Sequence, residues 1–229
     1  MAFYLSTHNS VCVGVSGGSD SNIIVHIIAT YFREYLDKVH FVFQNTGLEY
    51  AATKRHIDYM EQRYNVKIDR MSSGKGNNIV EVVRREGLPL VSKEFSKTLY
   101  YAQHGGQWAI DKMYQTRKEN PHAFPKKQQE LAKYCTENNI AVSAKCCDSA
   151  KKNPFARYLR SVKADLKISG ERQAEGGVRA TAHKDCFVAG KIDKYMPLWF
   201  WNDETKAYYK EQEGIVYSDC YEVWGMTRQ

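Results

Sequence analysis

The first 70 residues alternate short apolar runs with longer stretches of helical period. Residues 11–15 and 39–43 are continuous apolar runs rich in β-branched and aromatic side chains, which is typical of buried strands. The stretches 22–35 and 50–64 that follow them have the apolar period of helices, and a third strand is expected at 66–70. Continuously apolar strands separated by helices favour a parallel sheet covered on both faces.

Beyond residue 70 the pattern is weaker. Helices are expected at 78–86, at 128–138 and from the capping residues Asn202 and Asp203 to about 213, and a strand is expected at 167–169. Between 87 and 106 the apolar residues show no clear period. We predict an α/β fold, a parallel twisted sheet with helices on both faces. One α/β domain would span residues 1–180, and a helical C-terminal extension, 181–229, would pack on it.

Composition narrows the classes of protein that need to be considered. The 229 residues are 43% hydrophobic and 26% charged, and no apolar run approaches the roughly 20 residues of a membrane span. The first ten residues lack the pattern of a secretory signal, so a cytoplasmic, reducing environment is expected, where six cysteines are thiols or metal ligands.

The charge points to anionic partners. The formal net charge is +7, and basic residues gather at 112–127 and 145–167 with aromatic residues interleaved. This mixture suits the phosphates and bases of a nucleic acid, although the phosphates of a nucleotide would satisfy the same charges.

The turn after the first strand carries the clearest chemistry. It is formed by Ser16, Gly17, Gly18, Ser19, Asp20 and Ser21. A glycine-rich turn between a buried strand and a helix presents backbone N–H groups and the positive end of the helix dipole, and phosphate is the natural ligand there. Asp20 would repel phosphate unless a cation intervened, so this residue predicts bound Mg²⁺. The alternative is a turn that merely joins strand to helix.

Ser-Gly-Gly-Ser-Asp-Ser is similar to the SGGxDS signature of the PP-loop ATP pyrophosphatases, and later motifs resemble the phosphoadenosine phosphosulfate (PAPS) reductase branch of that superfamily. The later matches are Asn45-Thr46-Gly47-Leu48-Glu49 to DTGLE, Ser92-Lys93-Glu94 to SKE, Lys145-Cys146-Cys147 to KCC, Gly170-Glu171-Arg172 with Glu175 and Arg179 to GxRxxEsxxR, and 197–217 to a Trp-rich C-terminal segment. Together they imply an adenine nucleotide alpha hydrolase-like (Rossmann-like) fold.

The resemblance implies two chemistries. Pyrophosphatases of the superfamily split ATP and adenylylate an acceptor, whereas the reductases bind PAPS or adenylyl sulfate and attack its sulfur with a cysteine. Asp20 is typically lost from the reductases and is kept here, and the terminal Glu-Cys-Gly-Leu-His of thioredoxin-dependent reductases is absent. Both features favour an ATP-dependent adenylyl- or sulfur-transferase. The alternatives are a PAPS or adenylyl-sulfate reductase and a non-catalytic nucleotide-binding module.

The resemblance also assigns roles. Asp20, Lys93, Cys146 and Cys147 are the catalytic candidates, and Asp20 is the magnesium ligand. The loop 16–21, Thr46, Gly47, Gly170, Arg172 and Arg179 would bind ATP or PAPS. The expected partners are the adenine nucleotide, a nucleic-acid acceptor as in tRNA thiolation or DNA phosphorothioation, a sulfur-donor protein and a second copy of the chain in a homodimer. No membrane partner is expected.

Several of these residues have plainer interpretations. Cys147, Cys186 and Cys220 are candidate ligands of an iron–sulfur cluster, yet no Cys-x-x-Cys is present. Cys146 or Cys147 would instead be a nucleophile or persulfide carrier activated by Lys145 and Lys151, or all the cysteines would be inert, with Cys12 and Cys135 in the core. Arg172 and Arg179 would otherwise pair with Glu171 and Glu175, and Lys93 would face solvent. The Trp199–Trp201 run is expected to be structural.

Overall fold

The computed structural model describes residues 1–176, 181 and 183–227. Contacts within the chain separate two compact units, which are described one at a time. The first comprises residues 1–45, 49–71 and 155–229, and the second residues 46–48 and 72–154. The domain boundary predicted at residue 180 stays a prediction. Among the described residues, none of the helices combines the length and apolarity needed to cross a bilayer.

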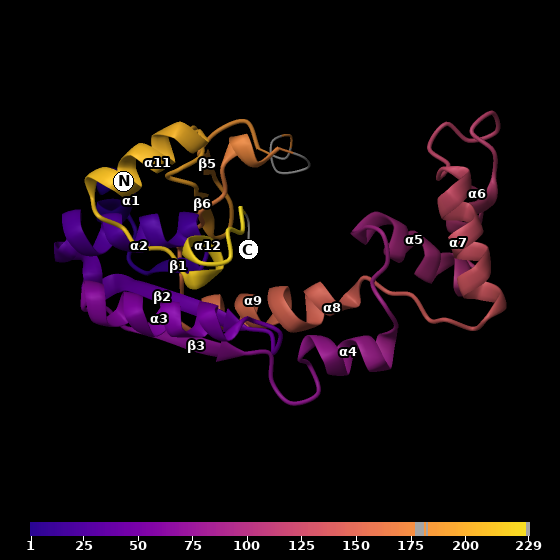
Figure 1. Cartoon of the computed structure of the whole chain (residues 1–229), viewed down its shortest axis with the longest axis horizontal. Helices are drawn as coiled ribbons and strands as arrows, with labels where there is room; N and C mark the ends of the chain where they lie inside the picture. Colours follow the sequence, from indigo (N-terminus) through magenta and orange to yellow (C-terminus); the bar gives the residue numbers. More distant parts are fainter. Residues whose placement is uncertain (177–180, 182, 228–229) are drawn as a thin grey trace. The chain divides into compact units, whose positions relative to one another are not determined.

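The first unit is built on a six-stranded sheet (Figure 1). Its strands, in spatial order, are β3 (Ile68–Ser72), β2 (Val39–Asn45), β1 (Val11–Val15), β4 (Leu166–Ile168), β6 (Asp193–Tyr195) and β5 (Phe187–Val188). β1 pairs in parallel with β2 and with β4, and β4 pairs in parallel with β6. Only β5 is antiparallel to its neighbour among the pairings described.

Helices cover both faces of this sheet, as the sequence predicts. The helices and turns of the unit are α1 (Ala2–Thr7), α2 (Ser19–Tyr31), η1 (Arg33–Lys38), α3 (Ala51–Tyr64), α9 (Asn153–Ser161), η3 (Gln173–Glu175), α11 (Asp203–Gln212) and α12 (Asp219–Glu222). Val13 and Val15 face α2 and α3 in one core cluster, whereas the alternate residue Cys12 packs with Leu159 of α9 in another. This alternation is the pleat of a strand buried on both faces.

Most of the predicted elements of the first unit are present with shifted ends. α2 begins at Ser19, three residues earlier than expected, because Gly18 already serves as its N-cap, and it ends at Tyr31, where η1 follows. Asn202 caps α11 as predicted. The short strands β6 and, at the edge of the sheet, β5 were not expected in a C-terminal region interpreted as helical.

The second unit is helical. Its elements are α4 (Ile79–Glu86), α5 (Lys93–Gln103), α6 (Gln107–Tyr114), α7 (Lys126–Glu137), α8 (Lys145–Cys147) and the π-helical turn η2 (Asp148–Lys152). α4 has the predicted bounds within one residue, with a capping box from Asn78 to Glu81 and Gly87 at φ 108° after its last turn. A separate core holds α5, α6 and α7 together, formed by Phe95, Leu99, Met113, Ala132, Cys135 and Val142.

Candidate functional site

The turn 16–21 is a closed loop held by its own serines. The Ser16 N–H donates to Ser21 Oγ at 3.2 Å, the Gly18 N–H donates to Ser16 Oγ at 3.1 Å, and Ser21 Oγ donates to the Gly18 carbonyl at 2.9 Å. Gly17 has φ 77°, and a Cβ there would lie 2.6 Å from Thr53 Cγ2. Only glycine fits this position, because both the backbone conformation and the contact exclude a side chain.

The loop opens directly into the N-terminus of α2. Gly18 is the N-cap and has no capping side chain, so the first amides of the helix, from Ser19 onward, are not satisfied within the helix. Gly170, which follows β4, lies against Asp20 and Ser21 at this helix end. These are the features of an anion site at a helix N-terminus.

Asp20 and Arg172 lie together, as the nucleotide-binding prediction requires. Arg172 Nε is 3.1 Å from Asp20 Oδ1, and Arg172 Nη2 is 2.8 Å from Asp203 Oδ1. Lys206 Nζ reaches the same Asp20 oxygen at 2.9 Å. Burial opposes the charge of Arg172, but Asp20 and Asp203 outweigh it and raise the pKa of the guanidinium. Arg172 therefore stays charged inside the site.

Three polar atoms of this cluster are buried without a well-directed hydrogen bond. They are Asp20 Oδ1, Arg172 Nε and the hydroxyl of Tyr217. Burial, with Asp20 nearby, raises the pKa of Tyr217, so its hydroxyl stays protonated. Buried polar groups are normally hydrogen-bonded, so a set of incompletely satisfied atoms beside a phosphate loop is what a site completed by a ligand would leave. A carboxylate oxygen next to bound phosphates is also a ligand that Mg²⁺ accepts, so the residues present fit the ion.

Tyr221 of α12 touches the loop directly. A Cβ on Gly18 would lie 3.2 Å from the Tyr221 hydroxyl oxygen. Burial raises the pKa of Tyr221, and the nearby Ser19 opposes this shift. The phenol oxygen thus lies beside the helix end that an anion would use.

Buried polar side chains hold Asn22, the residue that follows the phosphate loop. Asn22, the residue after the loop, contacts His56 Nε2 through Nδ2 at 2.9 Å and donates to the Val216 carbonyl at 2.7 Å. Tyr64 donates to Asn22 Oδ1 at 3.2 Å. Burial lowers the pKa of His56 to about 4, against the pull of Asp219 and Glu222, so this histidine is neutral at physiological pH.

The predicted residues Thr46 and Gly47 belong to the second unit. The Thr46 carbonyl accepts from the Ile79 N–H at 3.0 Å, and Gly47, at φ 95°, lies against Asn78, where a Cβ would approach Asn78 Cβ to 3.2 Å. The turn that contains Thr46 and Gly47 is therefore held against the start of α4.

The predicted residues Lys93, Cys146 and Cys147 also lie in the second unit. Cys146 and Cys147 are half-buried free thiols in α8, and the π-helical turn η2 follows them directly. Lys93 Nζ is 3.4 Å from Asp148 Oδ1, which also binds Lys152 at 2.7 Å. Lys93 thus reaches the residue that follows Cys147. π-Helical turns are frequent at functional sites.

The remaining predicted thiols occur in the first unit. Cys220 is fully buried, with its sulfur 3.9 Å from Thr53 Oγ1. Burial and Asp185 raise the pKa of the Cys186 thiol, which disfavours the thiolate that metals bind. In the described part of the chain, no three His, Cys, Asp or Glu side chains are grouped to hold a metal ion. The residues described do not fit an iron–sulfur cluster, and we derive no chemistry from one.

Arg172 and Arg179 are the two arginines predicted to bind the nucleotide. Arg179 lies outside the described residues. For Arg172, the alternative of a surface pairing with Glu171 does not hold, because Glu171 pairs with Lys194 at 2.8 Å and Arg172 is only 5% exposed. Cys12 and Cys135 are buried, and Trp199 is buried while Phe200 is exposed, so the structural interpretation of these residues is confirmed.

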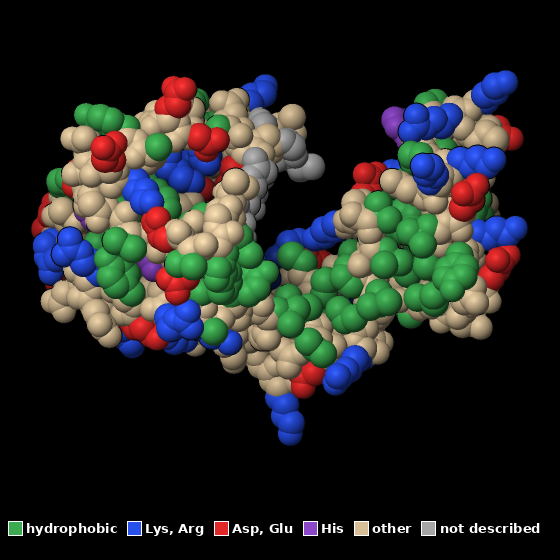
Figure 2. Space-filling model, viewed as in Figure 1, with side chains coloured by type: hydrophobic (Ala, Val, Ile, Leu, Met, Phe, Trp, Pro, Cys, Tyr) green, Lys and Arg blue, Asp and Glu red, His purple; other side chains and the backbone are tan. Residues whose placement is uncertain are grey.

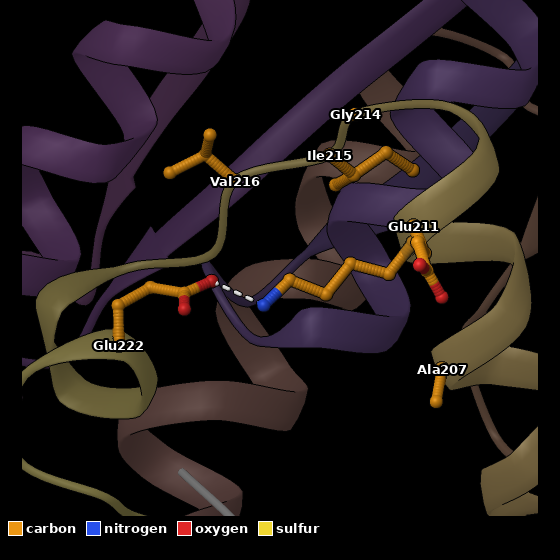
Figure 3. A pocket seen from close by; sticks show the side chains of 7 residues that line it. Ala207, Glu211, Gly214, Ile215, Val216 and Glu222 are labelled. Carbon is orange, nitrogen blue, oxygen red and sulfur yellow. Dashed lines mark ion pairs between the residues drawn. The ribbon is translucent and has the colours of Figure 1, made fainter.

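A groove of about 610 Å³ lies on the first unit, between α11 and the chain leading into α12 (Figure 3). The ion pair between Lys210 and Glu222, 2.6 Å apart, crosses it. The other lining residues are Ala207, Glu211, Gly214, Ile215 and Val216. None of the residues predicted for the site lines this groove, so it is distinct from the phosphate loop.

Sequence reasoning missed the residues that the C-terminal segment brings to the loop, namely Asp203, Lys206, Tyr217 and Tyr221. Lys206 lies in α11, where Ala207 and Tyr208 are exposed although they are less polar than Lys206, so the sequence gives no sign that the lysine is the more buried residue. Its position is known only from the structure, in which the Lys206 side chain is 15% exposed and contacts Asp20 of the phosphate loop.

A nucleotide-binding α/β fold with a phosphate loop at a helix N-terminus is the class that this geometry defines. Residues 10–100 match the family model of the phosphoadenosine phosphosulfate reductase domain. This match includes the phosphate loop and supports the resemblance to the PAPS reductase family.

Two further likenesses agree with this placement. An uncharacterized protein of Methanocaldococcus jannaschii is 34% identical over 86 residues, which are 38% of this chain and 17% of that protein's length. The chain thus spans less than a fifth of this curated relative. The crystal structure of a phosphoadenylyl-sulfate (PAPS) reductase from Candida auris, a phosphate complex, superimposes with a TM-score of 0.57, covering 97% of this chain and 81% of that one. At 12% identity this likeness shows the fold.

Proposed function

We propose that the chain is an ATP-binding PP-loop enzyme that adenylylates an acceptor and releases pyrophosphate, in the service of sulfur transfer. An acceptor oxygen would attack the α-phosphorus of ATP, the bond to the β-phosphate would break, and pyrophosphate would leave. A sulfur nucleophile, supplied by a donor protein, would then displace AMP from the acceptor. We place this reaction in the cytoplasm, in keeping with six free thiols.

The observation that carries the proposal is the position of Asp20. Its carboxylate stands at the N-terminus of α2, where an anion is favoured, and one of its oxygens is buried without a directed hydrogen bond. A carboxylate in a phosphate site is unfavourable unless a cation joins the two. Asp20 and the phosphates would hold Mg²⁺, which would supply charge stabilisation to the leaving pyrophosphate.

The test is calorimetric titration of the purified protein with MgATP and, separately, with PAPS, followed by an assay of pyrophosphate release. We expect MgATP to bind and pyrophosphate to be released once an acceptor is present. Asp20→Ala should abolish the release. Binding of PAPS in preference to ATP would overturn the proposal, and tight ATP binding without turnover on any acceptor would favour a non-catalytic nucleotide-binding module.

A PAPS or adenylyl-sulfate reductase is the second candidate, and the adjacent thiols favour it. Cys146 and Cys147 are half-buried rather than enclosed, and Lys93 and Lys152 both bind the next residue, Asp148. Cys146→Ser and Cys147→Ser should abolish sulfite release from PAPS if this candidate is right, and should leave ATP binding unchanged.

The acceptor we propose is a nucleic acid. Residues 46–48 and 72–154 contain 14 Lys and Arg against 8 Asp and Glu, so the second unit carries +6 of the chain's +7. Four aromatic side chains of this unit are exposed, namely Tyr101, Trp108, Tyr114 and Tyr134. Figure 2 shows Lys and Arg side chains around hydrophobic ones on the part of this unit that includes α5–α7. Such a surface suits phosphates and stacked bases.

Fluorescence anisotropy with labelled tRNA and single-stranded DNA tests the acceptor class. The double variant Arg117→Glu/Lys118→Glu, in the α6–α7 turn, should weaken binding at least tenfold and flatten its salt dependence. Lys191→Glu, an exposed position of the first unit, is the matched control. Equal loss in both variants would point to bulk charge, and no binding by the wild-type protein would exclude these acceptors.

A further inference from the structure

α11 delivers a lysine into the phosphate loop. Lys206 Nζ donates to Ser19 Oγ at 2.7 Å and lies 2.9 Å from Asp20 Oδ1. The side chains of Lys206 and Asp20 are 15% and 18% exposed, so solvent screens this ion pair only partly. The next lysine on the same face of the helix, Lys210, pairs with Glu222 instead.

Asp20 has two cationic partners of different character. Arg172 is tied to Asp203 at 2.8 Å and to the Trp201 carbonyl at 3.3 Å in addition to Asp20, and its planar guanidinium is fixed by these contacts. Besides Asp20, the described partners of Lys206 are the Ser19 hydroxyl and, at 6.0 Å from Nζ, the ring of Tyr217. An ammonium on a four-carbon stem moves easily. Lys206 is therefore the partner that Asp20 can exchange.

A divalent cation that binds Asp20 would displace Lys206 by charge repulsion. An ammonium 2.9 Å from the carboxylate oxygen would repel a metal ion binding the same oxygen, because both are positive. An incoming phosphate at the N-terminus of α2 would attract the same ammonium. Both forces act in the same direction, away from Asp20 and toward the phosphate.

We propose that Lys206 is the counter-ion of Asp20 in the nucleotide-free protein and a phosphate-binding residue in the complex. Its transfer to phosphate would leave the Asp20 carboxylate to the metal ion, so that the divalent cation is taken up with the nucleotide rather than before it. This inference rests on the proposed nucleotide site and adds the residue that couples metal and phosphate binding there.

The experiment measures Mn²⁺ binding to the full chain without nucleotide, by electron paramagnetic resonance. Lys206→Met should bind Mn²⁺ about tenfold more tightly than the wild type, because the competing ammonium is gone. The gain should vanish in the double variant Asp20→Asn/Lys206→Met, which locates the ion. Lys210→Met, one turn along α11, should leave Mn²⁺ affinity unchanged. Thermal melts confirm that each variant is folded, and Lys206→Gln, which keeps a donor, replaces Lys206→Met if that variant is not.

MgATP titrations of the same variants complete the test. Lys206→Met should weaken MgATP binding about tenfold, the usual effect of losing one charge-assisted contact. Mn²⁺ affinity that is equal in Lys206→Met and the wild type, including no binding by either, would overturn the inference. If instead the wild-type protein fails to bind ATP, the proposed function fails. The Mn²⁺ comparison still reports whether Lys206 competes with a metal ion for Asp20.

Discussion

Gly170 lies in contact with the backbone of Asp20. A Cβ placed on Gly170 would come within 3.0 Å of Asp20 Cβ and 3.1 Å of its carbonyl carbon, tighter than most Cβ contacts in proteins. The absence of a side chain at Gly170 therefore lets the segment after β4 pack closely against the start of α2.

Gly170→Ala should consequently displace the start of α2. We expect a loss of about 1–3 kcal/mol in the free energy of unfolding, typical of overpacking, together with weaker MgATP binding. Gly14→Ala is the control, since a Cβ there meets only the Ile168 carbonyl at 3.9 Å. Urea denaturation and calorimetry measure both quantities, and equal behaviour of the two variants would show that Gly170 has room for a methyl group.

Removing the Tyr221 hydroxyl should make the loop more accessible to anions. The phenol oxygen lies beside Gly18 and Ser19, at the helix end where phosphate would bind. Tyr221→Phe should raise the association rate of MgATP about fivefold, the equivalent of a hydrogen bond of roughly 1 kcal/mol. Stopped-flow fluorescence measures the rate. Tyr208→Phe, an exposed position of α11, should leave it unchanged, and a slower rate in Tyr221→Phe would mean that the hydroxyl assists binding.

Acid should destabilise the first unit through His56. Its pKa of about 4 lies below the ordinary value of 6.5, so the unfolded chain binds the proton more readily between these pH values. The stabilising contribution is complete above pH 6.5, falls as the pH drops toward 4, and amounts to roughly 3 kcal/mol. Urea midpoints between pH 7.5 and 4.5 should fall less steeply in His56→Gln than in the wild type, whereas the exposed control His122→Gln should follow the wild type.

Five of the six thiols should react in two groups. Cys12, Cys135 and Cys220 are buried, and burial raises the pKa of Cys12 to about 12. Iodoacetamide labelling of the native protein, followed by mass spectrometry, should modify Cys146 and Cys147 first. Fast labelling of Cys12 would mean that the sheet opens near α9 under native conditions, contrary to its packing with Leu159.

The sequence predicted the parts of the fold where local pattern and burial agree. β1, the loop 16–21 and α2 are contiguous, and each carries its own signal in hydrophobic period or glycine content. α5 and α6 were missed, because their apolar residues serve a small separate core formed with α7 and show no long period.

The site was predictable only where its residues follow a strand. Asp20 and Arg172 come directly after β1 and β4, and the carboxyl ends of neighbouring parallel strands lie at one edge of a sheet. Lys206, Tyr217 and Tyr221 reach the loop through the course of the C-terminal chain, about which local periodicity says nothing. The structure supplied these residues.

Lys206 and Tyr221 lie next to Ser19 in the fold although they are far from it in the sequence. The loop is synthesised first, yet Tyr221 is made some 200 residues later, by the distance between positions 19 and 221. A growing chain on the ribosome therefore carries the helix end and Asp20 without the lysine and tyrosine that occupy them in the folded protein. The cluster around Asp20 is complete only once residue 221 has been made, and a product shortened before residue 206 would retain the glycine-rich turn but lose the lysine that we propose competes with a cation for Asp20.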